Sequence, residues 1–100
     1  MPALPARGAR TALVSVVGAD PDGSTVLDLL AGRGVDTAGV VTDAARPTAA
    51  KRRVLADDAL VARYDTVPPP TAAPAVREAL AAALAAALAE APDAVVVCDY

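Results

Sequence analysis

The sequence of 100 residues is long enough for one small domain or for part of a larger one. Its net charge of −3 argues against a general nucleic-acid binder, because such proteins usually carry a basic excess. Histidine is absent and there is a single cysteine, which excludes an internal disulfide and any multi-cysteine metal site.

The first predicted element is a strand over residues 11–17, TALVSVV. This nearly continuous run of apolar, β-branched residues is typical of a strand buried on both faces of a parallel sheet. A turn, GADPDGS, follows, and Asp22 or Ser24 in it can act as the N-cap of a helix. That helix is expected to end near Gly32 or Gly34, since glycine favours the C-cap conformation.

The middle of the chain predicts a small separate sheet. A second strand is expected over residues 37–43, TAGVVTD, and a β-hairpin is expected from TAAKRRVLA and ALVARYD, which flank Asp57 and Asp58. These strands, at about residues 37–66, carry more charge than the first strand and have no helices between them. The prolines of VPPP then break the sheet.

The last third of the chain predicts a long helix and a final strand. Pro74 suits the first turn of a helix. Leucine and valine then recur every four residues and predict one packing stripe, made of Val76, Leu80, Leu84 and Leu88. Residues 93–99, DAVVVCD, predict another buried strand, parallel to the first, with Cys98 as a buried apolar side chain. The order β-α-β-hairpin-α-β predicts an α/β fold.

No membrane partner is expected. The N-terminal stretch MPALPARGAR has no apolar run long enough for a signal peptide. The most apolar segment, REALAAALAAALAEA, is shorter than the roughly 20 residues that span a bilayer. We therefore predict a cytoplasmic protein.

The basic run KRR is the first candidate site. Residues two apart on a strand point to the same face, so Lys51 and Arg53 project together and Arg52 projects to the other side. Two such cations can bind a phosphate, but from spacing alone a solvated edge strand is the favoured interpretation of the same residues. Arg63 and Asp65 share a face of the partner strand, which favours a structural cross-strand pair.

Two further segments are candidate ligand-binding sites. Asp99 follows a predicted parallel strand, at the sheet edge where α/β proteins bind ligands. The turn GADPDG lacks the spacing of a phosphate-binding loop, and its aspartates would repel an anion, so it is interpreted as a capped turn.

Three segments, taken together, resemble a known family. VVGADPDGSTVLDLLAGRGVDTAGVV resembles the ribokinase-like (PfkB) sugar kinases, in which Val-Gly leads to Asp-x-x-Gly and later to Gly-Val-x-Thr. RPTAAKRRVLADDALVARYD is similar to the heptose-7-phosphate kinases, which carry Pro-Thr-x-x-Lys-x-Arg-Val and then Arg-x-Asp. DAVVVCDY is similar to their following strand, which ends in Ser-Asp-Tyr.

The resemblance implies a three-layer α/β/α sandwich with a small β-sheet lid, and places Lys51 and Arg53 on that lid, near a phosphorylated sugar. With Asp99 they are the expected substrate-binding residues. The complete family enzyme uses ATP and Mg²⁺ to phosphorylate a sugar phosphate. The chain departs from the heptose kinases at Ala59 and Leu60, where they carry two glutamines, and at Cys98, where they carry serine. The glutamine change puts the heptose substrate in question.

The resemblance also implies missing parts. The upstream Gly-Gly segment, the nucleotide site and the Gly-Ala-Gly-Asp motif with the catalytic aspartate are not in this sequence, so we expect no catalytic residue here, no bound cofactor and no turnover by this chain alone. The competing hypothesis is a non-catalytic module that forms a homodimer through its lid strands by sheet augmentation. A nucleic-acid-binding hairpin is disfavoured by the acidic charge and by the lack of aromatic residues for stacking.

Overall fold

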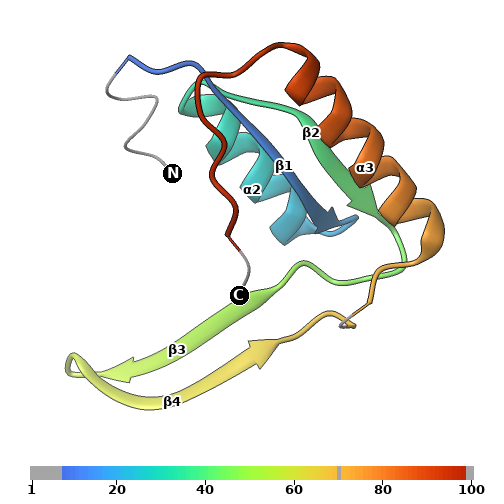
Figure 1. Cartoon of the computed structure of the whole chain (residues 1–100). Coiled ribbons are helices and arrows are strands. Elements are labelled where there is room, and N and C mark those ends of the chain that lie inside the picture. The colour runs from blue at the N-terminus through green and yellow to red at the C-terminus, as the bar shows by residue number, and fades with distance from the viewer. Residues whose placement is uncertain (1–7, 70, 99–100) are drawn as a thin grey trace.

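The computed structural model describes residues 8–69 and 71–98, which form two separate sheets and two helices. In chain order the elements are β1 (Thr11–Gly18), α2 (Pro21–Gly32), β2 (Val35–Asp43), β3 (Ala50–Ala56), β4 (Ala59–Thr66) and α3 (Pro74–Ala89). β1 and β2 pair in parallel, and β3 and β4 form an antiparallel hairpin that projects away from them (Figure 1). The predicted α/β fold is confirmed.

The β1–α2–β2 segment is a parallel crossover unit. The apolar, β-branched β1 pairs along its length with β2, from Thr11 opposite Val35 to Gly18 opposite Asp43. Helices α2 and α3 both pack against this sheet, one on each face, which gives the expected three layers (Figure 1). The buried apolar side chains of the described residues are Val17 and Val35, so the core is small.

Helix α3 does not use the leucine stripe that its sequence predicts. Leu84 and Leu88 remain 44% and 47% exposed. The half-buried residues of the helix are instead Val76, Leu80, Ala83 and Ala87. These residues recur at helical spacing and include two alanines, whose small side chains let the helix lie close to β1 and β2. The prediction was right for the first half of the stripe and wrong for the second.

The predicted C-terminal strand is not formed. Residues 93–98 have no strand structure, and Val95, Val96 and Val97 are 56%, 67% and 84% exposed. Cys98 is also exposed rather than buried. A β-branched run becomes a strand only where a neighbouring strand pairs with its backbone, and β1 pairs here with β2 alone among the described residues. Asp99 lies outside the described residues.

The small second sheet is the β3–β4 hairpin. Its turn is formed by Asp57 and Asp58, as predicted, and both have positive φ, 49° and 64°. Two consecutive residues of this conformation make the tight turn whose twist matches a hairpin. The strand expected at 37–43 belongs to β2 and the main sheet, so the hairpin is shorter than the expected lid range of about 37–66.

Candidate functional site

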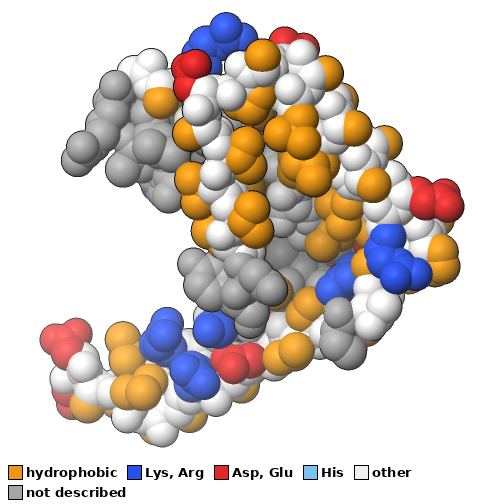
Figure 2. Space-filling model, viewed as in Figure 1, with side chains coloured by type: hydrophobic (Ala, Val, Ile, Leu, Met, Phe, Trp, Pro, Cys, Tyr) orange, Lys and Arg blue, Asp and Glu red, His pale blue; other side chains and the backbone are white. Residues whose placement is uncertain are grey.

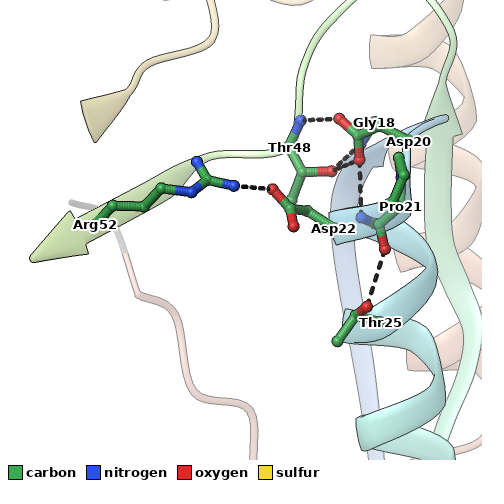
Figure 3. Close-up of polar contacts among 8 residues, drawn as sticks. Gly18, Asp20, Pro21, Asp22, Thr25, Thr48 and Arg52 are labelled. Carbon is green, nitrogen blue, oxygen red and sulfur yellow. Dashed lines mark hydrogen bonds and ion pairs between the residues drawn. The ribbon is translucent and has the colours of Figure 1, made fainter. Parts of the chain in front are cut away.

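A connected cluster of polar residues joins the start of α2 to the root of the hairpin (Figure 3). Asp20 is the N-cap of α2, and its Oδ1 accepts a hydrogen bond of 2.8 Å from the Gly23 amide. The same carboxylate accepts two hydrogen bonds from Thr48, from Oγ1 at 2.6 Å and from the backbone amide at 2.9 Å. Thr48 Oγ1 in turn accepts a hydrogen bond of 2.9 Å from the buried amide of Gly18.

This cluster, which we call the Asp20–Thr48 clamp, corrects the predicted cap. The sequence pointed to Asp22 or Ser24, but Asp20 stands three residues before Gly23, which is the spacing of an N-cap carboxylate and the amide that it binds. Thr48 gave no local signal, because it lies 28 residues from Asp20. The interpretation of GADPDG as a capped turn is confirmed.

Two glycines make the clamp possible by close packing. A Cβ on Gly18 would overlap the Arg46 carbonyl oxygen and would lie 2.7 Å from the Thr48 nitrogen. A Cβ on Gly23 would overlap the Gly18 carbonyl oxygen and would lie 3.0 Å from Thr48 Oγ1. The end of β1, the first turn of α2 and the β2–β3 loop therefore meet at a point where no side chain fits.

The clamp also sets the charge of Asp20. The hydrogen bond from the Thr48 hydroxyl, followed by those from the Thr48 and Gly23 amides, lowers the pKa of the Asp20 carboxyl from its ordinary value of 3.8. These donors stabilise the ionised form, so Asp20 carries a fixed negative charge at neutral pH. An anionic ligand is therefore not expected at this helix N-terminus.

A second contact joins α2 to the hairpin further along β3. Arg52 Nη2 lies 2.7 Å from Asp22 Oδ2, and Figure 3 shows the arginine reaching from β3 to the first turn of α2. The Arg52 guanidinium also lies over the ring of Tyr64 on β4, 6.0 Å from its centroid. The sequence placed Arg52 on the face opposite to Lys51 and Arg53, and on that face Arg52 has two partners among the described residues, Asp22 and Tyr64.

The opposite face of the hairpin carries the predicted anion-binding residues. The cross-strand register places Lys51 opposite Asp65 and Arg53 opposite Arg63. Arg63 contacts Asp65 at 3.5 Å, whereas Lys51 and Arg53 have no ion pair within the described part of the chain. Arg53 and Arg63 thus place like charges directly opposite each other, an arrangement that is unfavourable on a sheet. Figure 2 shows Lys and Arg side chains gathered on the hairpin.

Two grooves flank the hairpin root. One, of about 300 Å³, lies between α2 and β3, and its lining includes Thr48, Lys51 and Arg52. The other, of about 250 Å³, lies between the end of β2 and the start of α3, where Arg46 Nη2 donates a hydrogen bond of 3.0 Å to the Pro69 carbonyl oxygen. Lys51 therefore borders a groove, whereas Arg53 does not line either of these two.

The described residues do not form a site for Mg²⁺ or for another metal ion. Across 8–69 and 71–98, no group of three or more histidine, cysteine, aspartate or glutamate residues is placed to hold one. In the same ranges no helix has the length and apolar character needed to cross a membrane.

Comparison with known proteins gives partial matches of one kind. The bifunctional protein HldE of Geobacter sulfurreducens is 42% identical over 62 residues, which is 62% of this chain and 13% of that protein. The bifunctional protein HldE of Helicobacter pylori is 39% identical over 57 residues, which is 57% of this chain and 12% of that protein. The chain thus spans about an eighth of the length of these curated relatives. No family model matches the sequence.

Two solved structures have a similar fold. A PfkB protein from Polaromonas superimposes with a TM-score of 0.56 and 25% identity, over 65% of this chain and 22% of that one. An uncharacterized sugar kinase from Pyrococcus horikoshii superimposes with a TM-score of 0.54 and 29% identity, over 67% of this chain and 23% of that one. In each case the shared region is a minor part of the larger protein.

Proposed function

We propose that this chain belongs, over the region that it shares with them, to the ribokinase-like (PfkB) sugar kinases, and that it supplies the sugar-phosphate-binding lid of such an enzyme. The reaction of the complete enzyme would transfer the γ-phosphoryl group of ATP to a hydroxyl of the sugar phosphate and give ADP. A heptose 7-phosphate is the substrate that the similarity to HldE favours. We expect the complete enzyme to act in the cytoplasm, because ATP is available in that compartment.

The observation that carries this proposal is the face of the hairpin with Lys51 and Arg53. Both side chains are exposed, both lie on one face of β3, and neither has an ion pair in the described part of the chain. Arg63 stands opposite Arg53 and adds a third cation to the face, and Asp65, opposite Lys51, adds one carboxylate that contacts Arg63. An anion with several charged oxygens, such as a phosphate monoester, relieves this repulsion and accepts hydrogen bonds from the guanidinium groups.

ATP and Mg²⁺ belong, in this proposal, to the complete enzyme, and we assign no described residue to either of them. The described residues form no carboxylate cluster for a metal ion. Phosphoryl transfer depends on positioning, charge neutralisation and a base. In this proposal Lys51 and Arg53 position the sugar phosphate. Asp99 is a further proposed substrate contact, on the basis of family resemblance alone.

The test uses alanine substitutions in the complete kinase that carries this sequence. Lys51→Ala and Arg53→Ala should each weaken sugar-phosphate binding by about 1.5–3 kcal/mol, the range for a hydrogen bond to a charged group. ATP affinity should barely change. Arg33→Ala is the matched control. Arg33 is exposed and is the C-cap of α2, so it lies at the opposite end of that helix from Asp22. Equal effects at Arg33 and Arg53, measured by calorimetry, would refute a specific phosphate site.

Apolar side chains on the hairpin favour a second candidate function, dimerisation of this chain with a second copy. Val54, Leu55, Leu60, Val61 and Tyr64 are 46–64% exposed. Within the described residues, β3 and β4 pair only with each other, so each has an edge open for sheet augmentation. Leu60→Lys and Val61→Lys should then lower the sedimentation coefficient of a dimer to that of a monomer. A parent protein that is monomeric at all tested concentrations would exclude this function.

A further inference from the structure

We infer that Asp22 and Arg52 form a latch that holds the β3–β4 hairpin in one orientation relative to the β1–β2 sheet. They are positioning residues for the basic face of the hairpin, and to that extent the inference rests on the proposed function. Neither residue belongs to the Asp20–Thr48 clamp, which joins the same two parts of the chain at another point.

The geometry requires two attachment points, because one would leave the hairpin free to turn. The clamp fixes Thr48, which is buried and lies two residues before β3 begins. The latch acts at Arg52, four residues further along, or about 13 Å in an extended chain. Two contacts at this separation define a direction, whereas the clamp alone acts as a hinge.

Few other contacts restrain the hairpin. Its strands contact each other extensively, but neither packs broadly against β1, β2, α2 or α3. Figure 1 shows the hairpin reaching away from the sheet with its turn at the far end. The 2.7 Å contact between Arg52 and Asp22 is the ion pair between the hairpin and the body of the chain among the described residues.

The latch also decides which face of β3 is free. Arg52 points to Asp22, and neighbouring side chains on a strand alternate, so Lys51 and Arg53 are turned to the other face. Tyr64, which faces Arg52 from β4, holds the guanidinium over its ring and limits its freedom. The arginine is thus pre-positioned by the hairpin itself before it meets Asp22.

An exposed ion pair suits a latch better than a structural support. The two side chains are 41% and 50% exposed, and such pairs contribute little to overall stability. Loss of the pair should therefore leave the fold intact and release only the orientation of the hairpin. Because exposed charges are screened by salt, the latch should weaken as ionic strength rises.

Distance measurement by double electron–electron resonance tests this directly in the complete protein that carries this sequence. Spin labels are attached to Ala31→Cys in α2 and Ala56→Cys at the end of β3, in a Cys98→Ser background; both labelled positions are exposed. The parent should give one narrow distance distribution. Asp22→Lys and Arg52→Glu should each broaden it, and the double variant Asp22→Lys/Arg52→Glu should restore the narrow distribution.

Asp28→Lys is the matched control, because it makes the same change of charge on an exposed residue of α2 that has no ion pair in the described part of the chain. A distribution for Asp22→Lys as narrow as that for Asp28→Lys would overturn the latch. A double variant that stays as broad as the single variants would overturn it as well.

A kinetic measurement separates the latch from the proposed function. If the hairpin presents the sugar phosphate, Asp22→Lys should raise the KM for that substrate about two- to five-fold, leave kcat nearly unchanged, and be rescued in the double variant. Broadening without any change of KM would support the latch and refute a role of the hairpin in substrate binding. A changed KM with a narrow distribution would refute the latch and leave the proposed function standing.

Discussion

Replacement of Thr48 by valine tests how far the clamp stabilises the fold. Valine keeps the shape of threonine but has a methyl group in place of Oγ1. The buried Gly18 amide, which donates to Oγ1 at 2.9 Å, then has no acceptor. A buried donor left without a partner costs about 1–3 kcal/mol, so Thr48→Val should lower the free energy of unfolding by that amount. The loss should appear as a lower denaturant midpoint with an unchanged m-value.

Urea unfolding followed by far-UV circular dichroism is the suitable assay, because the sequence has no tryptophan and the signal comes from α2 and α3. Thr48→Ser keeps the hydroxyl and should cost at most about 1 kcal/mol for the lost methyl group. Thr42→Val makes the same exchange at an exposed position of β2 and should change stability by less than about 0.5 kcal/mol. Equal midpoints for Thr48→Val and Thr42→Val would refute the role assigned to the hydroxyl.

Three further predictions follow from the same region and from the hairpin turn. Gly23→Ala should destabilise the protein by about 1–3 kcal/mol, because its Cβ would overlap the Gly18 carbonyl oxygen. Gly32→Ala is the control and should stabilise α2, because nothing lies within 4 Å of a Cβ at that position. Melting temperatures that rise for both variants would contradict the close packing at Gly23. The lowered pKa of Asp20 means that its carboxylate stabilises the fold above pH 3.8 and ceases to do so as pH falls through the lower folded value. The stability difference between parent and Asp20→Asn should accordingly be full at pH 6 and shrink in acid, and a difference that does not vary with pH would be inconsistent with this. Asp58→Gly should stabilise the hairpin by up to about 1 kcal/mol, because φ is 64° at this position and glycine adopts a positive φ without strain. Asp65→Gly within β4 is the control and should destabilise the hairpin. The expected observation is slower amide exchange of β3 and β4 in Asp58→Gly.

The elements that the sequence predicted well are those whose signals are local. An apolar, β-branched run gave β1, and charged strands around two aspartates gave the hairpin and its turn. Proline at the start of α3 and glycine at the end of α2 matched the helix boundaries within a few residues. The similarity of three short segments was sufficient to identify the ribokinase-like fold, which the solved sugar kinases confirm.

Where the prediction was wrong, the outcome depended on what an element contacts. The apolar run at residues 93–98 has the composition of a strand but no pairing partner among the described residues, and it stays irregular. The periodicity of α3 predicted one leucine stripe. In the second half of the helix, however, the half-buried residues are Ala83 and Ala87, and the leucines are exposed. Composition sets what a segment can form, and the neighbouring segments decide whether it does.

The sequence by itself determined that Lys51 and Arg53 share one face of a strand, because alternation is a property of the extended backbone. It could not show that Arg52 meets Asp22, or that Thr48 closes on Asp20, since these partners are 30 and 28 residues apart. Only the fold of the β2–β3 loop against the first turn of α2 brings them together. That tertiary contact decides that Arg52, and neither Lys51 nor Arg53, has an ion pair among the described residues.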